Sequence, residues 1–278
     1  MVPLQRVSST LPAVFDLDGY LERIGLSSYS GLAGLHRAHA TSIAFENLDP
    51  HGGLHVSLEV QDLQRKLVRD RRGGYCFEQN LLLKAALQAL GAEVEPMLAR
   101  VRRGAPPDTI RPRTHLVLRV HAEGSSWLAD VGFGSGTLLE PLPFGPGEVR
   151  EQSGWRFRLI EDGQELVLQT ADREGWTDIY GFVPQPVPSV DIETSNWYTT
   201  AHPRSPFVTG LIVSTQAQDG TRTMLNDWSG EPSLAEQSPA GQDTVTAVAR
   251  EQIPALLAER FGLAGFALND DGRIVRAG

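Results

Sequence analysis

The spacing of apolar residues changes near Gly91, and this change constrains the fold more than any other feature of the 278-residue chain. Before Gly91, apolar residues recur every three or four positions, as Leu83, Leu87 and Leu90 do, and this spacing is typical of one face of a helix. After Gly91, apolar and polar residues alternate, first in residues 94–102, as in half-buried strands. The sequence therefore predicts a helical first part followed by a β-rich part, which we expect to be a barrel.

The expected elements follow from the same periodicities. Helices are expected at residues 18–25, 30–48, 57–70 and 77–90, and strands at 94–102, 115–121, 127–131, 155–160 and 165–170. Residues 183–196 are rich in prolines and acids and predict a connecting stretch, followed by strands at 207–215 and 222–227. A last helix is expected at 252–261, with Pro254 in its first turn, where the missing N–H loses no hydrogen bond.

Composition excludes several classes of protein. The net charge of −9 argues against a nucleic-acid partner, because such binding depends on clustered Lys and Arg. The single cysteine excludes an internal disulfide. Residues 1–6 lack a signal-peptide pattern, and no apolar run approaches the ~20 residues that span a bilayer. We therefore expect a soluble, cytoplasmic protein with no membrane partner.

The single cysteine, Cys76, follows Gly73 and Gly74 and begins a predicted helix. At a helix N-terminus, unpaired N–H groups and the helix dipole favour the thiolate over the thiol. A lone cysteine is more often a small buried apolar side chain. The double glycine, which allows an unusual turn, and the polar residues 78–80 favour a reactive thiol instead.

Two further residues complete a possible catalytic set. His115 begins one predicted strand, and Asp130 interrupts another, apolar strand at 127–131, where a buried carboxylate needs a partner. The loop at 123–126 predicts a hairpin that brings both residues toward the same open end. A strand histidine and a turn-forming aspartate are the ordinary alternatives. The order cysteine, histidine, aspartate indicates nucleophilic acyl chemistry, in either a transferase or a papain-like or transglutaminase-like hydrolase.

The segment from Arg72 to Asn80 closely resembles the active-site segment of the arylamine N-acetyltransferases. Other segments resemble motifs of that family in the same order, namely residues 20–26, 42–48, 114–118, 128–134 and 196–207. One departure is Ala44, which stands where the family usually has proline and frees the backbone before Phe45.

The resemblance implies an α+β fold of three parts with a papain/transglutaminase-like Cys-His-Asp site. A helical bundle at 1–92 would carry the nucleophile, a β-barrel at 93–196 the histidine and aspartate, and 197–278 would form a small α/β lid. It also implies an enzyme without a metal that uses acetyl-CoA as co-substrate. Cys76 would hold the acetyl group as a thioester, in a ping-pong mechanism, before an aromatic amine, arylhydroxylamine or hydrazine accepts it. His115 would move the proton, and Asp130 would orient the imidazole.

The resemblance extends to substrate contacts. Gly132 and Gly134 would let the backbone approach the CoA phosphates, and Phe45, Phe133 and Phe207 would line the amine pocket. The alternatives are a plain turn for the glycines and core packing for the phenylalanines. The pair at 71–72 is more consistent with a structural ion pair to Glu46 or another acid than with a substrate ligand. An alternative function is that of a family-related amide synthase, which forms amide bonds with a larger acyl donor. The sequence determines neither the amine substrate nor the oligomeric state.

Overall fold

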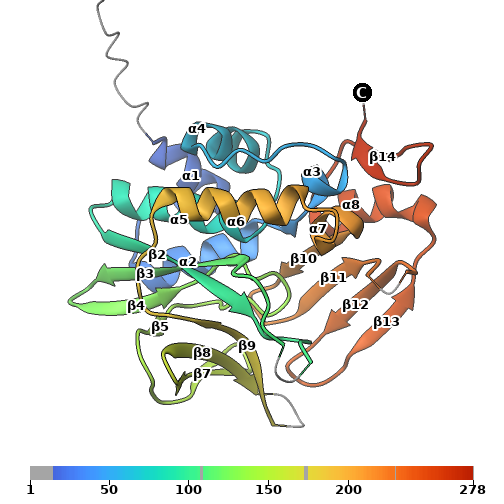
Figure 1. Ribbon diagram of the computed structural model, residues 1–278. Helices are drawn as coiled ribbons and strands as arrows, with labels where there is room; N and C mark the ends of the chain where they lie inside the picture. Colours follow the sequence, from blue (N-terminus) through green and yellow to red (C-terminus); the bar gives the residue numbers. More distant parts are fainter. Residues whose placement is uncertain (1–14, 107–108, 172–174, 229, 278) are drawn as a thin grey trace, which may run out of the picture.

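The computed structural model describes residues 15–106, 109–171, 175–228 and 230–277. Residues 1–6, where no signal peptide was expected, lie outside this described part. The described chain forms a helical bundle, an eight-stranded sheet and a five-stranded C-terminal sheet. In Figure 1 the bundle lies at the top, the eight-stranded sheet at the lower left and the C-terminal sheet at the right.

The bundle contains the four predicted helical regions, although two of them are shorter or less regular than expected. Its elements are α1 (Leu17–Arg23), α2 (Leu32–Ser42), β1 (Phe45–Glu46), α3 (Leu48–His51), α4 (Val60–Leu63), a π-helical turn (Gln64–Arg69) and α5 (Cys76–Ala89). The expectation of one helix over 30–48 was wrong. The helix ends at Ser42 because Phe45 pairs with Ser214 in an antiparallel sheet, and backbone groups cannot serve a helix and a sheet at once.

Helix α5 joins the bundle to the barrel. Its apolar stripe is fully buried at Leu83 and Leu87 and packs in the same core cluster as Leu118 of the barrel. Gly91 follows the helix with φ +87°, a left-handed conformation that commonly ends helices.

The eight-stranded sheet curls into a nearly closed antiparallel barrel with the strand order β5-β4-β3-β2-β9-β8-β7-β6. Its strands are β2 (Glu93–Val101), β3 (His115–Ala122), β4 (Ser125–Ala129), β5 (Leu142–Pro143), β6 (Arg150–Gln152), β7 (Trp155–Asp162), β8 (Glu165–Ala171) and β9 (Trp176–Phe182). All five strands predicted in this region are present, but β4 ends at Ala129, so Asp130 directly follows the strand and does not lie within it as expected. The predicted hairpin is confirmed as β3–β4, with Leu118 opposite Ala129.

The C-terminal part corrects two predictions. Residues 183–196 are not only a connection, because helix α6 (Ser189–Ala201) begins directly after Pro188 and crosses residue 196, the expected boundary between barrel and lid. The expected strand at 207–215 begins only at Ile212, because Ser205 caps the short helix α7 (Pro206–Thr209) and accepts a hydrogen bond from the backbone N–H of Phe207.

The five-stranded sheet has the order β1-β10-β11-β12-β13, so the helical part contributes its edge strand. The remaining elements are β10 (Ile212–Gln216), β11 (Arg222–Asn226), β12 (Ser233–Gln237), β13 (Thr244–Ala247), a 3₁₀ turn (Arg250–Gln252), α8 (Ile253–Phe261), β14 (Phe266–Leu268) and β15 (Ile274–Arg276). Helix α8 confirms the last predicted helix and ends at Gly262, which has the left-handed conformation.

A buried network of charges lies beneath the start of α5. Arg72 Nη2 is 2.7 Å from Glu46 Oε1 and 2.9 Å from Asp49 Oδ1, which confirms the predicted ion pair. Lys66 Nζ is 2.7 Å from both Asp49 Oδ2 and Glu78 Oε1. Since these charges are mostly removed from water, each depends on its partners.

Glu78 links this network to the nucleophile. Its Oε2 accepts a hydrogen bond from the backbone N–H of Tyr75, directly before Cys76. Burial raises the pKa of Glu78 to about 7, against the opposing effect of Lys66. The network therefore fixes the backbone that presents Cys76.

Removing one buried charge tests how far the fold depends on this network. We expect Arg72→Ala to lower the free energy of unfolding by about 3–5 kcal/mol, because Glu46 would be left buried without its main partner. The matched control is Arg65→Ala, whose side chain is 62% exposed and pairs with Asp62, and we expect a loss of about 0–1 kcal/mol. Urea unfolding followed by circular dichroism measures both. Equal losses in the two variants would contradict a structural role for the buried network.

Candidate active site

Cys76 is the first residue of α5, and its side chain is buried at the wall of a large cavity. Its Sγ lies 3.6 Å from the carbonyl oxygen of Thr114, to which the thiol can donate a hydrogen bond while it carries its proton. The two glycines before it are needed for space, since neither has a positive φ. A Cβ on Gly73 would lie 2.3 Å from the carbonyl oxygen of Ala44, and one on Gly74 would lie 2.8 Å from Glu78 Oε2. The double glycine therefore lets the nucleophile loop pack closely against its surroundings.

His115 and Asp130 form a direct buried pair. His115 Nε2 is 2.8 Å from Asp130 Oδ2. The predicted hairpin brought the two residues to the same end, but it did not fix this direct contact. Burial lowers the pKa of His115, but the charge and hydrogen bond of Asp130, together with a hydrogen bond to Cys76, raise it to about 10 overall. Burial raises the pKa of Asp130, but His115, Asn80 and the N–H of Gly132 hold it below its ordinary value. At neutral pH the pair is therefore an imidazolium and a carboxylate.

Asn80 is a site residue that sequence reasoning did not identify. Its Nδ2 donates to Asp130 Oδ1 at 2.9 Å and to the carbonyl oxygen of Leu116 at 2.8 Å. Its Oδ1 accepts from the backbone N–H of Val131 at 3.1 Å. One signal could have identified it, because Asn80 follows Cys76 by four positions and so lies on the same face of the helix.

His36 of α2 is a second missed residue. Its Nε2 accepts a hydrogen bond from the backbone N–H of Asp130 at 3.1 Å, and its Nδ1 donates to the carbonyl oxygen of Leu139 at 3.1 Å. Burial lowers the pKa of His36 to about 4, so the ring is neutral at pH 7 and can accept this bond. No local pattern distinguishes His36 from another buried helix residue.

The two glycines after Asp130 also serve close packing. The N–H of Gly132 donates to Asp130 Oδ1 at 2.9 Å, and a Cβ there would lie 2.7 Å from Cys76 Cα. Gly134 has φ +83°, and a Cβ there would lie 3.2 Å from the Phe45 ring. Gly132 lines the cavity, whereas Gly134 is not among its described lining residues. The expectation that both glycines contact CoA stays a prediction.

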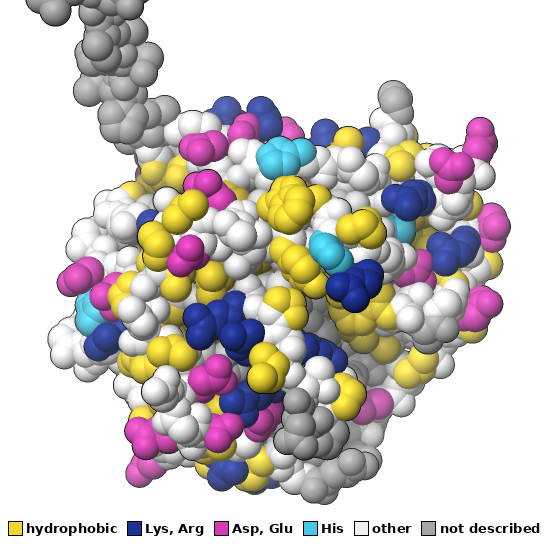
Figure 2. Space-filling view, viewed as in Figure 1, with side chains coloured by type: hydrophobic (Ala, Val, Ile, Leu, Met, Phe, Trp, Pro, Cys, Tyr) yellow, Lys and Arg dark blue, Asp and Glu magenta, His cyan; other side chains and the backbone are white. Residues whose placement is uncertain are grey.

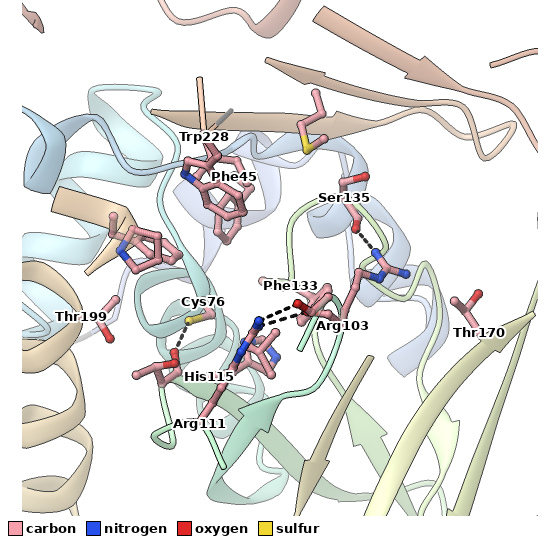
Figure 3. Close-up of a pocket in the computed structure, with 18 of the residues that line it drawn as sticks. Phe45, Cys76, Arg103, Arg111, His115, Phe133, Ser135, Thr170, Thr199 and Trp228 are labelled. Carbon is pink, nitrogen blue, oxygen red and sulfur yellow. Dashed lines mark hydrogen bonds between the residues drawn. The ribbon is translucent and has the colours of Figure 1, made fainter. Parts of the chain in front are cut away.

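The cavity beside Cys76 has a volume of about 890 Å³ and lies between the barrel, helices α6 and α7, and the C-terminal sheet. The three phenylalanines proposed from the sequence all line it, and Figure 3 shows Phe45 and Phe133 together with Cys76 and His115. The ring centroid of Phe133 is 5.2 Å from that of His115, and Phe45 lies 6.1 Å from Phe207. The structure thus gathers these residues around one cavity, while their contact with an amine stays a prediction.

Other side chains of the cavity wall were not foreseen. They comprise three arginines and several aromatic residues from distant segments, namely Arg103, Arg111, Arg222, Trp155, Tyr198 and Trp228. Sequence patterns could not find them, because they meet only when the barrel and the C-terminal sheet are in place.

One cluster outside the cavity offers metal ligands. Glu93, Glu95 and His121 place possible ligand atoms within 4.8 Å of one another on β2 and β3. His121 Nε2 already lies 3.3 Å from Glu95 Oε2, and its Nδ1 lies 3.0 Å from Ser126 Oγ. Protein contacts thus occupy both ring nitrogens, and the expected absence of a metal stays a prediction. Within the described ranges, no helix is both long and apolar enough to cross a membrane.

A buried thiol beside an imidazolium–carboxylate pair is the arrangement found in enzymes that use cysteine as a nucleophile. The family model described as N-acetyltransferase matches residues 29–266. The chain belongs to the arylamine N-acetyltransferase family.

Individual relatives agree with this assignment. The arylamine N-acetyltransferase of Mycolicibacterium smegmatis is 42% identical over 213 residues, covering 73% of this chain and 78% of that protein. The enzyme of the same name from Mycobacterium tuberculosis strain H37Rv is 36% identical over 257 residues, which are 89% of each chain. The solved structure of Mycobacterium marinum arylamine N-acetyltransferase in complex with CoA superposes with a TM-score of 0.82 and 38% identity, covering 89% of this chain and 93% of that one.

The paired charges of His115 and Asp130 predict how stability depends on pH. The raised pKa of His115 contributes stability fully below its ordinary value of 6.5, and this contribution is lost as the pH rises toward about 10. The lowered pKa of Asp130 contributes stability above its ordinary value of 3.8 and is lost as the pH falls below it. We therefore expect Asp130→Asn to lose more stability at pH 6 than at pH 9.5, by at least about 1.4 kcal/mol, or one pKa unit. Urea unfolding of both proteins at both pH values measures this, and an equal loss would contradict the charged pair.

Proposed function

We propose that this protein transfers the acetyl group of acetyl-CoA to aromatic amines, arylhydroxylamines or hydrazines, through a thioester on Cys76. The observation that carries the proposal is the position of Cys76 and the His115–Asp130 pair together at the wall of one cavity. The CoA-bound structure of the M. marinum relative supports acetyl-CoA as the donor.

In the first half-reaction, the Cys76 thiolate attacks the carbonyl carbon of the acetyl thioester. A bond from carbon to the enzyme sulfur forms, the bond from carbon to the CoA sulfur breaks, and the His115 imidazolium supplies a proton to the departing thiolate. The raised pKa of His115 supports this starting state, because the proton is present on the ring at neutral pH.

In the second half-reaction, the amine nitrogen attacks the acetyl carbon on Cys76. His115, now neutral, takes the proton from the nitrogen as the enzyme thiolate leaves, so the Cys76 thiolate and the His115 imidazolium of the first half-reaction are restored. Asp130 accepts the N–H of the imidazole throughout and stabilises its charged form.

The aromatic wall supports transfer over hydrolysis. Phe45, Phe133 and Phe207 line the cavity with apolar surface, and this disfavours water near the acetyl-enzyme. A papain-like or transglutaminase-like hydrolase needs the opposite, because water is its second substrate.

Acetyl-CoA alone should therefore acetylate the protein once and then stop. We expect mass spectrometry to find one acetyl group on the peptide that contains Cys76, and CoA release to stall after about one equivalent. Cys76→Ser, which should remain folded, is the matched control without adduct. Continuous CoA release without an amine would favour hydrolysis. Acylation only by larger acyl-CoA donors would favour the amide-forming relatives.

With an amine present, parallel lines are expected in double-reciprocal plots of the steady-state rate, whereas intersecting lines would indicate direct transfer in a ternary complex.

Asp130→Asn should reduce turnover by at least roughly 10²-fold, because an amide cannot orient and stabilise the imidazolium as a carboxylate does. In the serine-protease triad, the same replacement of aspartate by asparagine lowers turnover about 10⁴-fold. Asp62→Asn, on α4 and away from the cavity, is the control and should keep normal turnover. Thermal melting establishes that both variants are folded at the assay temperature. Near-normal turnover in folded Asp130→Asn would leave a Cys76–His115 dyad.

A further inference from the structure

The active-site cavity has a charge opposite to that of the whole protein. Arg103, Arg111 and Arg222 line it, and the described lining residues include no aspartate or glutamate, although the net charge is −9. Figure 3 shows Arg103 and Arg111 in the cavity with Cys76, and Figure 2 shows dark blue side chains near the middle of the face between the barrel and the C-terminal sheet. A cavity of this kind attracts an anionic ligand.

Arg222 is the most unusual of the three. It begins β11, its residue is only 3% exposed, and its guanidinium lies 3.6 Å from the ring centroid of Trp155. Its Nε and Nη2 have no hydrogen-bond partner within the described residues. Burial, with a further contribution from Arg103, lowers the pKa of Arg222 to about 9. A buried arginine in this state is destabilising until a counter-charge binds it.

Polar atoms beside Arg222 lack partners as well. Gln216 lies opposite Arg222 across β10 and β11, and Gln216 Oε1 and Ser214 Oγ have no hydrogen-bond partner in the described chain. Residues 214 and 216 share one face of β10, because side chains alternate along a strand. Gln237, opposite Arg222 on β12, lines the cavity too. One face of the C-terminal sheet thus presents unpaired polar atoms around an unpaired cation.

The backbone N–H of Gly132 already donates to Asp130 Oδ1, and Gly134 is not among the described residues that line the cavity. An anionic group in the cavity therefore finds its strongest available partner at Arg222. A guanidinium suits both phosphate and carboxylate, because its planar N–H groups can donate to two oxygens at once.

We infer that Arg222, assisted by Arg103, forms an anion-binding subsite of the active-site cavity, which receives a phosphate or carboxylate carried by one of the two substrates. The donor would supply a phosphate of its CoA part, and the acceptor a carboxylate on its aromatic ring. The inference rests on the proposed function only for the choice between these two sources.

Two probes that cannot undergo acetyl transfer test the subsite by calorimetry. Adenosine 3′,5′-bisphosphate represents the phosphate-bearing end of CoA, and benzoate represents a carboxylated aromatic acceptor. We expect Arg222→Met to weaken the binding of one of them at least tenfold, because a hydrogen bond to a charged group is lost. Arg222→Lys should lose less, since the charge remains. Arg158→Met is the matched control, because Arg158 also stacks on a tryptophan, at 4.0 Å from Trp176, and does not line the cavity.

Each outcome bears on the inference. Selective loss of bisphosphate binding assigns the subsite to the donor, and selective loss of benzoate binding assigns it to the acceptor. Unchanged affinities in Arg222→Met, or no binding of either probe to the unaltered protein, would overturn it. Without ligand, Arg222→Met should melt no lower than the unaltered protein, because it removes an unpaired buried charge. If Arg222→Met does not fold, Arg222→Lys decides, and bisphosphate and benzoate affinities equal to those of the unaltered protein would overturn the subsite. Because neither probe reacts, the binding result tests the subsite even if the proposed acetyl transfer does not occur.

Discussion

The buried carboxylate of Asp130 is the constraint on which the rest of the structure depends. It stays charged in the interior because His115, Asn80 and the N–H of Gly132 all donate to it. These donors belong to the barrel, to helix α5 and to the loop after β4. One carboxylate therefore fixes the position of helix α5 relative to the barrel. The same contacts orient the histidine beside Cys76, and in this way the requirement of folding and the requirement of the proposed chemistry coincide.

A second buried set of charges holds the backbone directly before the nucleophile. Glu78 binds the backbone before Cys76 and is neutralised by Lys66, while Arg72 pairs with Glu46 at the edge of the C-terminal sheet. Pairs of this kind contribute little net stability compared with apolar packing, but they allow few alternative arrangements. A thiol placed by such a network has a fixed position relative to His115.

The cavity unites parts that are far apart in the sequence. Its aromatic wall comes from β1, the loop after β4 and helix α7, and its cationic wall comes from the loop after β2 and from β11. An apolar wall suits an aromatic acceptor and excludes water, whereas a cationic wall suits an anionic group. Under the proposed function and the proposed anion subsite, the apolar wall receives the aromatic part of a substrate and the cationic wall its anionic part.

The sequence alone determined the elements with strong local signals and the three residues of the candidate catalytic set. Helix α5 and the β3–β4 hairpin could be predicted because their periodicity and turn residues are local, and Cys76, His115 and Asp130 because a family resemblance marked them. Tertiary structure decided the rest. The strand at Phe45–Glu46 exists only because β10 lies beside it, and helix α6 forms in a segment whose prolines suggested a connection. His36 matters because it contacts Asp130, 94 residues further along the chain. Arg222 matters because it stacks on Trp155, which belongs to the other large sheet. Local patterns carry no information on such partners, because burial and pairing over these distances are fixed only when the whole chain has packed.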